Sequence, residues 1–479
     1  MMFNETLSDA GNARWFVRLY RESVRFVRER NSWLVHLGPS WSESTDGAIE
    51  RLAKDAAASI FANLDDCPKG IRDERIKHGL KTEQAPRLMA MLELAKSEPG
   101  ITVPLSALDR DPFLLGTRGG GIDLRAGSFK FPAANEYVTR QVGCEYRRGA
   151  QCPTWLAFLD RAMAGDAAMI EFLQRAVGYS LTGDTSEQCI FICHGPGANG
   201  KSVFLRTVRA LLGTYGADAS IETFTDRRDG SASNDLARLA NIRFVSATEL
   251  DEGRRLAEGL IKSLTGGEAL TARFLFREYF EFTPTFKVWL GVNHKPAIRG
   301  DDHGIWRRIR LVPFRVTIPP VEQDKTLAGR LLRELPGILN WATQGCVAWQ
   351  RDGLQAPNAV VSATNAYREE SDALGEWISE RCNLGHGIST QAKFLYDDYR
   401  SFIEDRGGEI LSMKRWGQRM VGKGLEKDEG RLVHYHGIGL CGLNGRNDNA
   451  ASFIGERDLR EFRGGFSEPC PYTHTHNEL

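Results

Sequence analysis

One stretch, HGPGANGKSVF at residues 194–204, limits the possible folds more than any other part of the chain. Its glycines, lysine and serine match G-x-x-x-x-G-K-[ST], a turn that joins a strand to a helix. The apolar run at residues 189–193 predicts a buried strand before the turn, and apolar residues at helical spacing over 203–212 predict a helix after it. A strand–loop–helix unit of this kind predicts a parallel α/β sheet.

The same turn predicts a phosphate site. Glycines let backbone N–H groups turn toward phosphate oxygens, and the N-terminus of the following helix adds its dipole. We expect Lys201 to reach the β- and γ-phosphates of ATP, and the hydroxyl of Ser202 to hold Mg²⁺. The predicted nucleotide-binding loop comprises Gly195, Pro196, Gly197, Ala198, Asn199, Gly200, Lys201, Ser202 and Val203.

Composition limits the partners that this chain can bind and the compartment in which we expect it. The 479 residues predict two to four domains, and 62 basic side chains balance 62 acidic ones. A DNA-binding chain without net charge has to gather its basic residues locally. No apolar stretch has membrane-spanning length and the N-terminus lacks a signal core, so we expect a cytoplasmic protein with no membrane partner. The nine cysteines contain no C-x-x-C pair and support neither a zinc ribbon nor a disulfide framework.

Acidic residues follow a second predicted strand, residues 242–247. We expect this strand to neighbour the strand of the phosphate loop, which would place Glu249, Asp251 and Glu252 near the metal and the attacking water. Glu249 comes first after the strand and is the expected metal ligand. Which of the three carboxylates acts as the base stays open.

Two later segments add polar groups to the same edge of the sheet. Asn293 ends a third predicted strand, residues 286–292, where its amide can touch the γ-phosphate or position water. Arg307 and Arg308 precede a fourth strand. An arginine in this place can reach the nucleotide of a neighbouring subunit and stabilise developing charge.

In this order, the segments GPGANGKS, RFVSATELDEGRRL, GVNHKPAIRG and GIWRRIRLVPF resemble a superfamily 3 helicase domain. The chain most resembles the phage and plasmid primase–helicase family, with its poxvirus relatives, over roughly residues 12–443. The resemblance implies an α/β fold with a P-loop, AAA+-like parallel-sheet ATPase core, a helical N-terminal preface and a small C-terminal winged-helix domain. It also implies an ATP-dependent DNA helicase of phage or mobile-element replication that acts as a homo-hexamer on single-stranded and forked DNA, with ATP and Mg²⁺.

The resemblance also assigns residues. Glu249 matches the strand-end acid and Asn293 the sensor asparagine, and either Arg307 or Arg308 is the arginine finger. Residues 265–282 fall where such helicases carry a hairpin that projects into the central channel. There, Arg273 and Arg277 would meet backbone phosphates, and the aromatic residues between them could stack on bases.

Family resemblance and local patterns together divide the chain. Residues 31–41 predict a hairpin closed at Gly38-Pro39, and residues 111–131 predict further hairpins. The expected divisions are an α+β region over 1–150, a helical pre-helicase segment over 151–184, the ATPase domain over 185–350, a linker and helix over 351–387, a winged-helix-like domain over 388–443 and a flexible tail over 444–479.

Relatives often carry a primase ahead of the helicase. The pair Asp109 and Asp111 is predicted to serve a turn or a cap instead of holding metals. We therefore expect no primase domain in this chain, and a separate primase or polymerase is a candidate partner.

The predicted winged helix rests on a helix capped by Ser389 or Thr390, a second helix capped by Ser412 and a strand near residue 435. Its second helix would carry the basic residues expected to contact duplex DNA, namely Lys414, Arg415 and Arg419. The alternative is a basic solvated helix in a domain that docks protein. For the whole chain, the alternatives are an AAA+-like origin or packaging ATPase that does not separate strands, and a nucleotide-gated DNA-binding protein.

Overall fold

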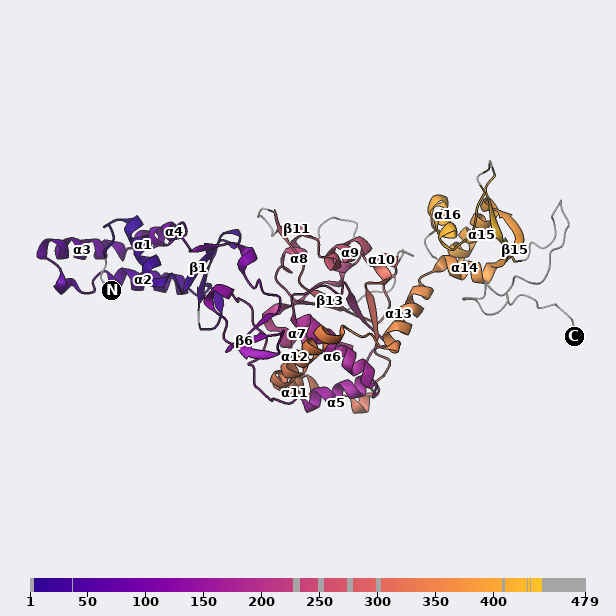
Figure 1. Cartoon of the computed structure of the whole chain (residues 1–479), viewed down its shortest axis with the longest axis horizontal. Coiled ribbons are helices and arrows are strands. Elements are labelled where there is room, and N and C mark those ends of the chain that lie inside the picture. Colours follow the sequence, from indigo (N-terminus) through magenta and orange to yellow (C-terminus); the bar gives the residue numbers. More distant parts are fainter. Residues whose placement is uncertain are drawn as a thin grey trace. The chain divides into compact units, whose positions relative to one another are not determined.

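The structure is a computed structural model that describes residues 4–36, 38–226, 233–248, 254–273, 279–298, 303–406, 410–428, 430 and 432–441. The chain forms two compact units, drawn in sequence colours in Figure 1. The first comprises residues 1–298 and 307–364, and the second comprises residues 299–306 and 365–479. Three structural parts lie within the first unit.

The N-terminal part packs helices on a four-stranded sheet of order β3-β2-β1-β4. Its elements are α1 (Asp9–Tyr20), β1 (Val24–Val27), β2 (Ser32–His36), β3 (Trp41–Glu43), α2 (Ala48–Ser59), α3 (Lys69–Thr82), α4 (Ala85–Ala95) and β4 (Thr102–Val103). The predicted hairpin at Gly38-Pro39 is confirmed, because β2 and β3 pair antiparallel with His36 opposite Trp41. Gly38 has a φ of 81°, a value that few residues other than glycine adopt.

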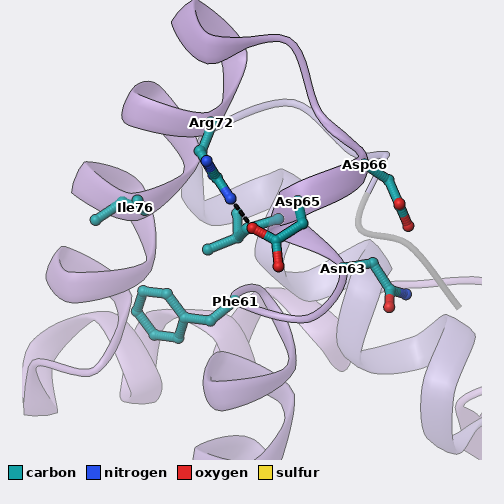
Figure 2. A pocket seen from close by; sticks show the side chains of 7 residues that line it. Phe61, Asn63, Asp65, Asp66, Arg72 and Ile76 are labelled. Carbon is teal, nitrogen blue, oxygen red and sulfur yellow. Dashed lines mark ion pairs between the residues drawn. The ribbon is translucent and has the colours of Figure 1, made fainter.

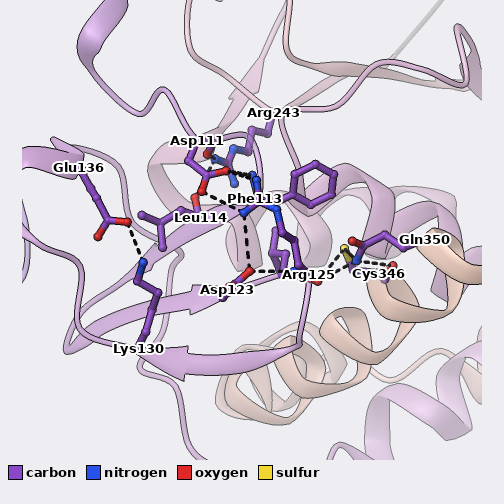
Figure 3. A network of polar contacts seen from close by, with 11 residues as sticks. Asp111, Phe113, Leu114, Asp123, Arg125, Lys130, Glu136, Arg243, Cys346 and Gln350 are labelled. Atoms are coloured by element: carbon purple, nitrogen blue, oxygen red, sulfur yellow. Dashed lines mark hydrogen bonds and ion pairs between the residues drawn. The ribbon is translucent and has the colours of Figure 1, made fainter.

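A three-stranded antiparallel sheet follows, made of β5 (Leu114–Thr117), β6 (Gly120–Asp123) and β7 (Ser128–Lys130). It confirms the hairpins predicted over 111–131. The carboxylate of Asp111 accepts the N–H of Phe113 at 2.9 Å and pairs with Arg125 through both oxygens, as Figure 3 shows. Burial alone would raise the pKa of Asp111, but Arg125 and the Phe113 N–H hold it below its usual value. Asp111 therefore serves a local turn, as predicted.

The third part contains a five-stranded parallel sheet of order β14-β8-β13-β10-β9. Its strands are β8 (Ile190–His194), β9 (Gly216–Asp218), β10 (Phe244–Thr248), β13 (Lys287–Val292) and β14 (Ile309–Pro313). The predicted parallel sheet is confirmed, but the expected neighbour of the loop strand is wrong. The strand β13 lies between β8 and β10, so the asparagine strand, and not the acidic one, pairs with the strand of the phosphate loop.

Helices and one hairpin surround this sheet. They are α5 (Pro153–Ala162), α6 (Ala167–Leu181), α7 (Lys201–Leu212), α8 (Ser233–Ala237), α9 (Glu258–Gly266), α11 (Leu327–Arg333) and α12 (Leu335–Asp352), together with β11 (Leu270–Arg273) and β12 (Tyr279–Phe282). In Figure 1, α6 and α12 lie side by side, and Gly178 packs against the backbone of Cys346 at their contact. Their apolar side chains belong to the same core as α5, α7 and the sheet strands.

Two buried cations fasten the preceding segments to the sheet. The guanidinium of Arg243 donates to the carbonyls of Leu181 and Leu114, each at 2.8 Å, and Figure 3 shows it directed toward the loop of Asp111. Lys287, at the start of β13, donates to the carbonyls of Thr182 at 2.5 Å and Asp184 at 3.0 Å. Backbone carbonyls thus satisfy cations that burial would otherwise disfavour.

The second unit contains α10 (His303–Trp306), α14 (Ala373–Arg381), β15 (Cys382–Gln391), α15 (Ala392–Asp405), α16 (Met413–Gly422) and β16 (His434–Leu440). The helix α13 (Asn358–Glu370) spans its boundary with the first unit. The helix expected within residues 351–387 is in fact two, α13 and α14, with Asp372 capping the second through Gly375 N–H at 2.9 Å. The predicted cap of Ser412 on α16 is confirmed.

The proposed cap of α15 is wrong. Ser389 and Thr390 pair with β16 as strand residues, and Gln391 precedes the helix. On this helix, Phe394 is 56% exposed, whereas Leu395, Tyr399, Phe402 and Ile403 are buried. The antiparallel pairing of β15 and β16 moves the helix start, because backbone bonds to β16 hold the preceding residues extended.

Candidate nucleotide and DNA sites

The phosphate loop connects β8 to α7, as the motif predicts. Ala198 and Gly200 have φ values of 58° and 87°, which turn the chain sharply into the helix. A side chain at Gly195 would collide with the carbonyl of Phe314, and one at Gly200 would press on the ring of Phe158. Both glycines are therefore required by close packing as well as by the turn.

Lys201 is the centre of this site. Its side chain is only 6% exposed, and burial lowers its pKa. The Nζ atom donates to the carbonyl of Gly195 at 2.5 Å, to Asn199 Oδ1 at 3.1 Å and to Asn293 Oδ1 at 3.0 Å. Because β13 pairs directly with β8, the loop lysine and the asparagine at the tip of the next strand meet at one point.

Some of the remaining loop residues hold the loop in place, and others are accessible to solvent. Asn199 is buried, and its Nδ2 donates to the Phe314 carbonyl at 3.2 Å, which ties the loop to the end of β14. The motif left this position unspecified, and the amide role comes from packing. Exposed positions are Pro196, Gly197, Ala198 and Ser202, while Val203 packs partly against the core. The Ser202 hydroxyl is thus accessible in the first turn of α7.

The three predicted acids, Glu249, Asp251 and Glu252, lie outside the described residues. The strand that leads to them, β10, ends at Thr248. Within the residues that the structure describes, no group of three or more His, Cys, Asp or Glu side chains could hold a metal ion.

The two candidate finger arginines differ in environment. Arg308 is 8% exposed, and its Nε donates to Thr265 Oγ1 on α9 at 2.9 Å. Arg307 is exposed, and its Nη2 donates to Gln188 Oε1 at 3.2 Å. A side chain that must reach another molecule has to be accessible, which favours Arg307.

The predicted hairpin at residues 265–282 is present. Strands β11 and β12 pair antiparallel, with Arg273 opposite Tyr279 and the guanidinium 4.9 Å from the centre of that ring. Tyr279 is 62% exposed. The hairpin tip and Arg277 lie outside the described residues.

The three basic residues of the second unit that are expected to contact DNA lie on α16. Lys414 and Arg415 are exposed and Arg419 is half-buried, whereas Trp416 and Met420 face the core. The helix therefore has a basic outer face, as the sequence predicted.

Comparison with known proteins finds two family models and several viral relatives that this chain resembles. The model of a family described as "D5 N terminal like" matches residues 13–164, and that of a family of unknown function matches residues 193–308. A "Putative helicase" of Acanthamoeba polyphaga mimivirus is 26% identical over 326 residues, 63% of this chain. A "Putative primase" of African swine fever virus is 26% identical over 216 residues, 41% of this chain. These similarities fit a member of a primase–helicase family.

The chain spans only part of the length of the curated relatives that it matches. The chain covers 34% of the mimivirus protein and 22% of the African swine fever virus protein. Among solved structures, the apo structure of the NrS-1 C terminal region aligns with a TM-score of 0.48 at 10% identity, over 89% of this chain and 99% of that chain.

None of the described helices is both long and apolar enough to cross a membrane.

Figure 2 shows a pocket in the N-terminal part, lined by Phe61, Asn63, Leu64, Asp65, Asp66, Arg72 and Ile76. Its ion pair joins Arg72 to Asp65, whose side chain is 95% exposed, so the pair is worth little energetically. The pocket contributes nothing to the nucleotide site.

Proposed function

We propose that this chain is an ATP-dependent DNA helicase of phage or mobile-element replication. The observation that carries the proposal is the 3.0 Å bond between Lys201 Nζ and Asn293 Oδ1. It joins the phosphate-loop lysine to the amide that a sensor role requires, at the carboxyl ends of two adjacent parallel strands. Ligands of open α/β sheets bind at this edge. The helicase names of the relatives support the choice of activity.

In the proposed reaction, Lys201 exchanges its bonds to loop oxygens for bonds to the β- and γ-phosphates of ATP, and Asn293 orients the γ-phosphate or the attacking water. The accessible Ser202 hydroxyl and the carboxylate of Glu249 are oxygen donors, which suit Mg²⁺. When bound, this ion neutralises charge that develops on the transferred phosphoryl group. Asp251 or Glu252 would then serve as the base.

In the proposed assembly, six copies of the chain form a ring. Arg307 reaches the nucleotide of the adjacent subunit, and ATP turnover moves the hairpin that carries Arg273 along single-stranded DNA. The winged helix of the second unit, with the exposed Lys414 and Arg415 and the half-buried Arg419, holds the duplex of the fork. A primase or polymerase acts in trans.

The test is strand displacement from a forked duplex that carries a fluorophore and a quencher, with ATP and Mg²⁺. The wild-type chain should separate the strands. Lys201→Ala should lose at least about a hundredfold in ATP turnover, because it removes the cation on the β- and γ-phosphates. If single-stranded DNA stimulates ATP turnover but the strands of the fork are not separated, the chain is instead an AAA+-like origin or packaging ATPase. Near-normal turnover in Lys201→Ala would refute the site itself.

A further inference from the structure

An exposed group of aromatic rings lies on the three-stranded sheet, apart from the nucleotide site. We call Phe129, Phe131 and Tyr146 the aromatic platform. The ring of Phe129 stacks on Tyr146 with centroids 5.5 Å apart and an interplanar angle of 15°. Phe131 meets Phe129 edge-on at 5.2 Å and is 76% exposed. Two rings thus support a third that remains open to solvent.

The sheet is shaped to hold these rings. Phe129 rests over Gly120, where any side chain would collide with the ring. Side chains alternate along an extended strand, so Phe129 and Phe131 share one side of the chain. Lys130, between them, turns away and donates to Glu136 at 2.7 Å, as Figure 3 shows. The exposed face of the platform therefore consists of aromatic rings and includes neither Lys130 nor Glu136.

Arginines border the platform. Arg118 follows β5, one residue before the turn into Gly120, and Arg147 and Arg148 follow Tyr146 directly. All three are exposed. Arg147 pairs with Glu145 at 3.4 Å, whereas Arg118 and Arg148 have no hydrogen bond or ion pair within the described part of the chain. The border has an excess of positive charge on a chain whose net charge is zero.

We propose that the aromatic platform binds single-stranded DNA by stacking on its bases, while Arg118 and Arg148 contact its phosphates. This site is separate from the hairpin of Arg273, and it rests on the proposed function as a DNA helicase. Every base has an aromatic face, so a solvent-exposed phenylalanine backed by fixed rings can bind any sequence. The unpaired arginines favour a polyanion over a second apolar protein surface, which would leave their charges buried without partners.

The first test measures binding of a fluorescein-labelled oligothymidylate to the full chain by anisotropy. Phe131→Ala should raise the Kd about 5- to 150-fold, the effect expected when one base loses its stacking partner. Phe131→Trp should retain wild-type affinity, because the larger ring still stacks. Phe394→Ala, which removes the same side chain at a 56% exposed site in the second unit, is the matched control and should bind as wild type.

Photo-crosslinking to the wild-type chain adds a readout that does not depend on how the variants fold. An oligonucleotide with 5-iododeoxyuridine should crosslink to the peptide that contains Phe131 or Tyr146. Wild-type affinity in folded Phe131→Ala, or crosslinks confined to other peptides, would overturn the proposal. If Phe131→Ala changes the oligomeric state without DNA, and the platform of the wild-type chain gives no crosslink, the proposal would also be overturned. The platform would then be a contact between copies of this chain. A wild-type chain that binds no single-stranded DNA would instead refute the helicase function itself.

Discussion

The adjacent arginines at the start of β14 make separable predictions. Arg307→Ala should reduce ATP turnover about 10³-fold with an unchanged Tm, because an arginine acting in trans stabilises charge on the transferred phosphoryl group. Arg308→Ala should lower the free energy of unfolding by about 2 kcal/mol, since it removes a buried side chain bonded to Thr265 Oγ1 at 2.9 Å. ATPase assays and thermal melts of both variants measure the two effects. Gln188→Ala removes the bond of Arg307 within its own subunit and should leave turnover unchanged. A stable but inactive Arg308→Ala would reverse the assignment.

At the scale of elements, Lys287 joins β13 to the end of α6. The Nζ donates to the carbonyls of Thr182 at 2.5 Å, Asp184 at 3.0 Å and Thr285 at 3.3 Å, and the side chain is buried. Lys287→Met fills similar space but leaves these carbonyls without their donor, so the free energy of unfolding should fall by about 3 kcal/mol or more. Urea unfolding measures the loss. Lys325→Met, at an exposed position, is the matched control and should change stability by less than about 0.5 kcal/mol. Equal stability of the two variants would show that water or other groups satisfy the carbonyls of Thr182, Asp184 and Thr285.

At the scale of the whole molecule, the ring requires active sites shared between subunits. Arg307→Ala keeps an intact phosphate loop, and Lys201→Ala keeps an intact arginine. Mixed rings should therefore regain ATPase activity wherever the loop of the first variant meets the arginine of the second. Because the finger contributes about 10³-fold or more, even a minority of rebuilt sites should exceed the background. ATPase assays across mixing ratios, with mass photometry to verify co-assembly, provide the measurement. Co-assembled mixtures that stay inactive at every ratio would contradict a shared site, and a chain that remains monomeric with ATP, Mg²⁺ and DNA would contradict the ring.

Local sequence was sufficient to predict the strand–loop–helix of residues 190–212 and the parallel sheet, whereas the hairpin of β11 and β12 was expected from the family resemblance. The strand–loop–helix and the sheet depend on neighbouring residues: glycines that permit the turn, and apolar periodicity that decides which faces are buried. The hairpin at Gly38 was predictable for the same reason. Residue roles that follow from a motif, such as that of Lys201, were likewise accessible from the sequence.

Features that depend on contacts between distant segments required the tertiary structure. Strand order is one, because the position of β13 beside β8 depends on pairing across about a hundred residues, and this pairing brings Asn293 to Lys201. The contrast between Arg307 and Arg308 is another, since Arg308 is buried and bonded to Thr265 of α9, whereas Arg307 is exposed. The start of α15 is a third. Ser389 and Thr390 are good caps by composition, but the pairing with β16 runs through Gln391, so the strand continues past both residues and Gln391 leads into the helix.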